Sequence, residues 1–177
     1  MAQQGSGSRL VGFRAFGLGK GALQSLYKNA EWPLGRPVQA CCLCGNYYGM
    51  QFKGERPTTR HERPPADDEN SCGLYAYDRL ETAELYIKAQ AKNRELMLGV
   101  VQLWGRIRVG RVIDGDKQLK QPGYRLRAEF ARVVALDKDQ AEAFPIRDGD
   151  QVEWVSRRYL EPWAADAFSG VRYRLED

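Results

Sequence analysis

The four cysteines and the only histidine of this chain lie between positions 41 and 72, a grouping that favours metal chemistry. They are Cys41, Cys42, Cys44, His61 and Cys72. A structural zinc ion takes four thiolate or imidazole ligands in a tetrahedron. The segment therefore offers one candidate ligand more than such a site needs.

The spacing of the cysteines leaves two ligand sets open. Cys41 and Cys44 have the spacing of a zinc knuckle, whereas Cys42 and Cys44 would share one side of an extended strand. His61 and Cys72 supply the other pair, on either side of the acidic segment ERPPADDENS. Burial as small apolar side chains explains one or two cysteines but not the whole group, and a redox Cys-x-x-Cys pair lacks its usual strand–helix setting. We therefore predict a structural zinc knot over residues 38–77.

The same residues argue against conventional catalysis. A hydrolytic zinc ion keeps an open coordination position, whereas four available ligands favour a closed site. The zinc-deaminase pattern also fails, because Glu62 follows His61 directly and the paired cysteines precede the histidine. With His61 assigned to the metal, the chain has no second histidine to act as the base for a serine or cysteine nucleophile. The sequence favours a binding protein over an enzyme.

Periodicity and turn signals predict the elements that must position these residues. Residues 9–16 and 23–28 have the pattern of two strands joined by the glycine turn GLGKGA, which lacks the Lys-Ser/Thr ending of a phosphate-binding loop. Trp32, in the following turn EWPLGRP, is expected to anchor that turn to the core. Residues 151–159 alternate like a further strand.

Two helices are predicted from capping pairs and helical spacing. The main one lies within residues 76–96, where Asp78 stands three positions before Glu81. A shorter helix is expected over residues 136–144, where Asp137 and Gln140 repeat the capping pattern.

The longest β signal is the stretch 97–136, in which apolar residues alternate on both sides of an Asp114-Gly115 turn signal. If the hairpin closes at that turn, position i pairs with position 229 − i. Leu103 would then face Leu126, Val101 would face Ala128, and both apolar sets would lie on one side of the sheet.

The other side of this hairpin is the predicted ligand-binding face. The same register places Trp104 opposite Arg125 and Gln102 opposite Arg127. An arginine over an indole is a cation–π arrangement, and neighbouring arginines repel unless anions or carboxylates attend them. The candidate ligand-binding residues are Trp104, Arg106, Arg108, Arg125 and Arg127.

The charge of this stretch is compatible both with a ligand-binding face and with an ordinary surface. Residues 99–135 carry eight Lys/Arg against three Asp/Glu, which suits a phosphate-bearing partner. The alternative is an ordinary solvated face whose charge Glu129 partly balances.

The totals and patterns together predict a β-dominated α+β fold. Antiparallel hairpins would form a small sheet or barrel, with one main helix and the structural zinc knot. Residues 1–8 are expected to be a flexible tail and residues 9–177 a single domain. No stretch approaches the roughly 18–20 apolar residues of a membrane span, and the N-terminus lacks the apolar core of a secretory signal. We expect no membrane partner and a cytoplasmic location, where clustered cysteines favour metal binding over disulfides.

Several motifs in a fixed order resemble a group of small uncharacterised actinobacterial proteins. The order is FRAFGLGKGALQSLYKNAEWPLGRPVQACC, then a histidine, then CGLYAY, LGVVQLWGRI and GYRLRAEFARV. Those proteins carry a hairpin, a Trp-Pro-x-Gly turn, a cysteine, a histidine, a Cys-x-Cys-Gly-Ile-Tyr-Ala motif and a Trp-Gly strand. The likeness spans roughly residues 11–136 and brings no activity with it.

The resemblance bears on the choice of zinc ligands. Counted from the Trp-Pro-x-Gly turn, the first cysteine of the group falls on Cys42 and its last on Cys72. The penultimate cysteine falls on Asn70, which cannot replace a thiolate, so Cys44 would be the substitute. The resemblance thus implies the set Cys42, Cys44, His61 and Cys72, with Cys41 as the alternative to Cys42.

Two functions follow as hypotheses. The first is a non-enzymatic, zinc-stabilised module that recognises nucleic acid or another phosphate-bearing ligand through the arginine and tryptophan face. The second is a protein-interaction adaptor or regulator, such as a phage or host-defence accessory factor. Its motivation is the number of aromatic residues without a matching catalytic set, namely Tyr47, Tyr48, Trp154, Tyr159 and Trp163.

Overall fold

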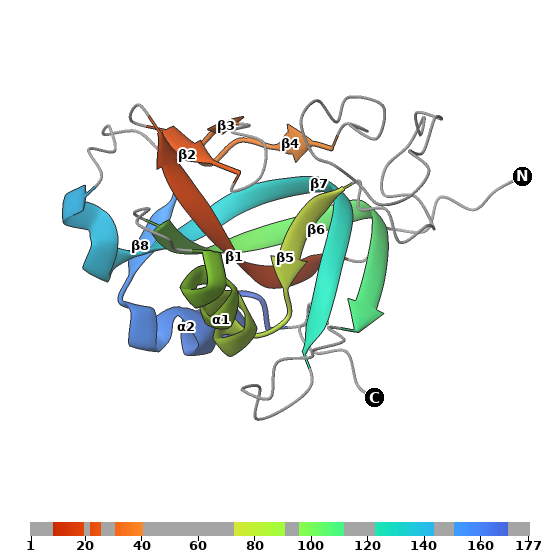
Figure 1. The fold of residues 1–177 in the computed structure, drawn as a ribbon. Coiled ribbons are helices and arrows are strands. Elements are labelled where there is room, and N and C mark those ends of the chain that lie inside the picture. Colours follow the sequence, from red (N-terminus) through yellow and green to blue (C-terminus); the bar gives the residue numbers. More distant parts are fainter. Residues whose placement is uncertain are drawn as a thin grey trace, which may run out of the picture.

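The structure is a computed structural model that describes residues 9–19, 22–25, 31–40, 73–90, 96–111, 123–143 and 151–169. In these ranges the chain forms one eight-stranded mixed sheet with helices on one side (Figure 1). The strands are β1 (Leu10–Gly19), β2 (Ala22–Gln24), β3 (Glu31–Trp32), β4 (Val38–Gln39), β5 (Leu74–Tyr77), β6 (Leu96–Arg111), β7 (Tyr124–Asp137) and β8 (Glu153–Val155). The helices are α1 (Leu80–Gln90) and α2 (Leu160–Ala167), with short 3-10 helices η1 (Lys138–Ala143) and η2 (Arg157–Tyr159). The prediction of a β-dominated α+β fold is confirmed.

Four strands of the sheet pair in a closed ring. β1 pairs with β6, β6 with β7 and β7 with β5, all antiparallel. The last side of the circuit is the single pair Phe13↔Tyr77 between β1 and β5. β4 and β8 extend the sheet along β7, and β8 runs parallel to it. The long strands therefore curl around an interior, as Figure 1 shows.

Apolar side chains fill both sides of this curled sheet. Because side chains alternate along a strand, Phe16 points into the interior and Phe13 points to the outer side, where the helices lie. The buried interior residues are Leu10, Phe16, Leu23, Trp32, Ala76, Met97, Val101, Leu103, Leu126, Ala128, Ala131, Val133 and Leu136. On the outer side, Ala83 of α1 and Leu160 and Ala164 of α2 cover the sheet. Each fully buried Phe or Leu stabilises the fold by about 1.5–3 kcal/mol.

The first predicted hairpin is confirmed in its pairing but not in its bounds, because residues 17–19 and Ala22 of the predicted turn belong to the strands, while residues 26–28 lie outside the described ranges. Leu18 of β1 pairs with Leu23 of β2 across the glycine turn. Trp32 is 2% exposed and meets the ring of Phe16 edge-on at 5.2 Å, so it anchors its turn to the interior as predicted.

α1 and η1 lie within the predicted ranges, whereas α2 was not predicted and the predicted strand 151–159 is confirmed only at β8, since Arg157–Tyr159 form η2. Two of the predicted capping residues, Asp78 and Gln140, make contacts with strands. α1 starts at Leu80, and Asp78 accepts the backbone N–H of Tyr124 at 2.7 Å, which ties the helix start to β7. The shorter helix is the 3-10 helix η1. Asp137 accepts the N–H of Asp139 at its start, whereas the amide of Gln140 bonds to the backbone of β6.

The predicted register of the β6–β7 hairpin is wrong. Ile107 pairs with Ala128 rather than with position 122, and Leu103 pairs with Ala131 rather than with Leu126. The strands end at Arg111 and Tyr124, so they do not close on a two-residue turn at Asp114-Gly115, which lies outside the described residues. The shift is six residues at Ile107 and five at Leu103, because the bulge between them adds one residue to β6. Side chains repeat every two residues, so an even shift, or an odd one offset by a bulge, leaves both apolar sets on the same side. The prediction that both apolar sets lie on one side of the sheet therefore fits several registers and does not decide between them.

A β-bulge at Gly105 bends β6. Trp104 pairs with Phe130 and Ile107 with Ala128, which leaves Gly105 and Arg106 opposite one residue of β7, Glu129. Gly105 has a φ of 79°, and a Cβ there would lie 2.8 Å from the ring of Phe130. Only glycine fits this position without strain. The bulge increases the local twist that lets the sheet curl.

Candidate functional site

Three of the predicted ligand-binding arginines meet on the outer face of β5, β6 and β7. Arg108 lies directly opposite Arg127, which in turn pairs with Tyr75 of β5. The guanidinium of Arg125, two residues from Arg127, lies 5.6 Å from the ring centre of Tyr75. We call Tyr75, Arg108, Arg125 and Arg127 the arginine–tyrosine face. The neighbouring residues Ala76, Leu126 and Ala128 point to the interior.

A buried contact holds Tyr75 in place. Arg14 of β1 donates hydrogen bonds to the backbone carbonyl of Tyr75 and to Oγ of Ser25. Its guanidinium also lies 4.5 Å from the ring centre of Trp32. The interior thus fixes the backbone of β5 beneath the arginine–tyrosine face.

Trp104 and Arg106 lie further along β6 than predicted. Trp104 stacks on Phe130, with ring centres 5.9 Å apart and planes 13° apart, and its predicted pairing with Arg125 is wrong. Arg125 pairs with Gly110 instead, so roughly 20 Å of strand separates it from Trp104. Arg106 is exposed in the bulge, where its backbone N–H donates to Glu129 Oε2 at 3.2 Å.

The sequence interpretation missed Arg132. Gln102 pairs with Arg132 and not with Arg127, and Arg132 Nη2 donates to Gln102 Oε1 at 3.0 Å. Arg132 stands one pair along from the Trp104–Phe130 stack on the same outer face. The signal that could have found it is the register, because the predicted one placed Arg127 at this point.

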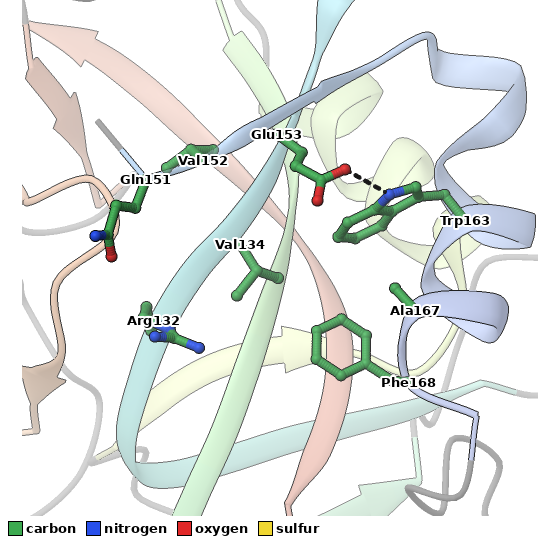
Figure 2. A pocket seen from close by; sticks show the side chains of 8 residues that line it. All are labelled: Arg132, Val134, Gln151, Val152, Glu153, Trp163, Ala167 and Phe168. Carbon is green, nitrogen blue, oxygen red and sulfur yellow. Dashed lines mark hydrogen bonds between the residues drawn. The ribbon is translucent and has the colours of Figure 1, made fainter. Parts of the chain in front are cut away.

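A cleft lies beside Arg132, between β7, β8 and α2 (Figure 2). Its volume is about 560 Å³. Trp163 of α2 donates its indole N–H to Glu153 Oε2 at 2.9 Å, which fixes the ring at one wall.

All predicted zinc ligands, Cys42, Cys44, His61 and Cys72, and the alternative Cys41, lie outside the described residues. The strands that flank them are described. Ala40, after β4, donates its N–H to the carbonyl of Glu129 at 2.7 Å, and Leu74 of β5 pairs with Ala128. The described residues on either side of the segment 41–72 therefore lie at adjacent positions of β7. Within the described ranges, no group of three or more His, Cys, Asp or Glu residues is placed to hold a metal ion.

Asp137 is a fully buried carboxyl at the end of β7. Its Oδ1 accepts the N–H of Asp139 at 3.0 Å, and its Oδ2 has no hydrogen-bond partner among the residues that the structure describes. Burial raises the pKa of Asp137 above its ordinary value of 3.8, although the N–H of Asp139 acts in the opposite direction. Arg157 lies close by but bonds Glu84 through Nε at 2.8 Å.

We expect Asp137→Asn to change the pH dependence of stability. Because the folded protein holds the Asp137 proton more tightly than the unfolded chain, the wild type loses stability as pH rises from about 3.8 through the raised pKa. The unfolding free energy of the wild type minus that of the variant should therefore fall between pH 4 and pH 7, by about 1.4 kcal/mol for each unit by which the pKa is raised. Urea denaturation at several pH values measures this difference.

Asp166→Asn, on the exposed side of α2, is the matched control for the loss of one carboxylate. An equal pH dependence of the wild type and Asp137→Asn would contradict the prediction.

In the described parts of the chain, no helix is long and apolar enough to cross a membrane. No protein-family model, curated protein or solved structure matches this chain. The side chains themselves are thus the ground for a functional proposal.

Proposed function

We propose that the chain is a zinc-stabilised, β-rich binding module for nucleic acid or another phosphate-bearing ligand. The observation that carries this proposal is the cross-strand grouping of three arginines with Tyr75 on one outer face. Guanidinium groups bind phosphate oxygens through two parallel hydrogen bonds, and an aromatic ring gives a base a surface on which to stack.

The pairing of Arg108 with Arg127 concentrates positive charge on this face. The two residues are direct cross-strand neighbours, so their Cβ atoms lie about 4.5–5.5 Å apart. A phosphate placed over them would accept hydrogen bonds from both guanidinium groups. The exposed Arg106 and the Trp104–Phe130 stack extend the same side of β6, which suits an extended single strand.

The flanking strands support the zinc part of the proposal. Cys42 follows Ala40 by two residues and Cys72 directly precedes Gly73, while Ala40 and Leu74 are held at adjacent positions of β7. The first proposed ligand, Cys42, is therefore two residues from Ala40, and the last, Cys72, is two residues from Leu74. A metal bound by Cys42, Cys44, His61 and Cys72, with Cys41 as the alternative to Cys42, would close the segment at its base. We place the protein in the cytoplasm, where thiolates stay reduced.

Salt-dependent binding of single-stranded oligonucleotides tests the proposal. We expect labelled single-stranded DNA or RNA to bind at low salt, with the logarithm of the affinity falling linearly as the logarithm of the salt concentration rises. Three arginine–phosphate contacts predict a slope of about −2. Fluorescence anisotropy measures both quantities, and undetectable affinity for DNA, RNA and nucleotides at low salt would overturn the proposal.

The adaptor alternative stays a prediction. Of the aromatic residues that motivate it, Trp154 packs against the interior and Trp163 against the outer apolar cluster, while Tyr159 is 51% exposed. Tyr47 and Tyr48 lie outside the described residues. No contact in the described ranges favours it over phosphate binding.

A further inference from the structure

The cleft between β7, β8 and α2 combines a cationic end with an aromatic end (Figure 2). Val134 lies at its centre, Arg132 and Gln151 lie at one end, and Trp163 and Phe168 lie at the other. A volume of about 560 Å³ is ordinary for a site that binds a small molecule.

Among the described residues, no anion balances the cationic end. Arg132 donates from Nη2 to the neutral amide of Gln102 at 3.0 Å, but its buried Nε has no hydrogen-bond acceptor among the described residues. No carboxylate in the described ranges forms a salt bridge with it. A ligand oxygen that accepts a hydrogen bond from this guanidinium would also balance its positive charge.

The aromatic end fixes the orientation of a ligand. Trp163 and Phe168 meet edge-on with ring centres 6.0 Å apart, and both line the cleft. Glu153, which holds the indole N–H, is exposed and carries a negative charge at the same end. That carboxylate repels an anionic group and accepts hydrogen bonds from N–H groups. A ligand would therefore place its anion at Arg132 and a flat ring with N–H donors near Trp163.

We infer that this cleft binds a mononucleotide, with its phosphate at Arg132 and its base against Trp163 and Phe168. An aromatic carboxylate shares the anion and the ring, but it has no N–H donor for Glu153. The cleft lies at the β8 end of β7 and the arginine–tyrosine face at the β5 end, so this inference does not depend on the proposed function.

Isothermal titration calorimetry with AMP, GMP, CMP and UMP at low salt tests the inference. We expect at least one mononucleotide to bind saturably, and adenosine, inorganic phosphate and benzoate each to bind at least tenfold more weakly. Arg132→Gln should weaken mononucleotide binding at least tenfold, because it removes the charge that meets the phosphate. Arg158→Gln removes an equal charge from an exposed arginine that stacks on Tyr159 outside the cleft, and it should bind like the wild type.

A second variant guards against a folding defect in Arg132→Gln. Ala167 is an exposed lining residue, so Ala167→Glu adds a negative charge to the wall and should also weaken binding at least tenfold. Arg125→Gln with Arg127→Gln should leave mononucleotide affinity unchanged, even if it abolishes oligonucleotide binding. The inference is overturned if none of the four mononucleotides binds at millimolar concentration, if inorganic phosphate binds equally well, or if Ala167→Glu binds like the wild type.

Discussion

Removing zinc from this protein is expected to lower its melting temperature by about 20 °C or more. Bound zinc contributes on the order of 10 kcal/mol in small modules, and each kcal/mol moves the melting temperature of a chain of this size by about 2–4 °C. On either side of the segment 41–72, Ala40 and β5 are held at adjacent positions of β7. The proposed metal would join the two ends of this segment, so its removal would take away that link between them.

Elemental analysis of protein purified in reducing buffer should find one zinc ion per chain. Calorimetry with and without a strong chelator then measures the loss of stability. Cys44→Ser, His61→Ala and Cys72→Ser should each abolish zinc binding, because each removes one of four ligands.

The cysteines also provide a matched control. If Cys42 is the ligand, Cys41→Ser should keep its zinc while Cys42→Ser loses it, and the opposite result would assign Cys41. A metal-free protein whose melting temperature is unchanged by chelator, or a disulfide between any two of these cysteines, would contradict the zinc prediction.

The faces of the strands could be predicted from the sequence, whereas their partners could not. Arg108 and Arg127 fall on the same side in the predicted and in the observed register because the two registers differ there by six residues, an even number. The period-two pattern therefore placed these arginines on one face correctly, although not as neighbours. The predicted register wrongly placed Trp104 opposite Arg125. The length of the connection between β6 and β7 and the bulges decide which residues pair, and the period-two pattern carries no information on either.

Only weak sequence signals mark the two register shifts between β6 and β7. Gly105 is a glycine inside a strand pattern, which often marks a bulge, but a glycine also occurs at position 110 of the same strand, where no side chain would be obstructed. The second register shift, between Val100 and Val101, adds Val134 to β7 and turns it toward the cleft. Nothing local distinguishes Val134 from the valine before it. The cleft therefore emerges only from the packing of β8 and α2, and the place of Arg132 from the observed register.

The burial of Asp137 could not be predicted from the local sequence either. The capping spacing predicted a polar contact at the start of η1, and Asp137 makes it through Oδ1. Its complete burial depends on β8, which pairs with it at Val155 from a distant part of the chain. Tertiary contacts thus turned an ordinary cap into a carboxyl with a raised pKa.

Replacing Arg108, Arg125 and Arg127 together by glutamine is expected to weaken single-stranded nucleic acid binding at least 100-fold at low salt. Hydrogen bonds to charged groups are each worth about 1.5–3 kcal/mol, and a loss of about 2.8 kcal/mol already corresponds to 100-fold. The salt slope should become shallower by about 2, since each lost phosphate contact with a single strand removes about 0.7. Circular dichroism should show that the variant is folded.

A matched triple variant separates a specific face from general charge. Arg9, Arg36 and Arg158 are exposed outside the arginine–tyrosine face, so their replacement by glutamine removes the same three positive charges. This control should keep most of the affinity and most of the salt slope. If both triple variants lose the same affinity, the protein attracts polyanions through its net charge alone, and the arrangement of arginines around Tyr75 has no part in recognition. If only the first loses it, the cross-strand pairing of β5, β6 and β7 is what creates the binding surface, because these residues are distant in the sequence and meet only in that sheet.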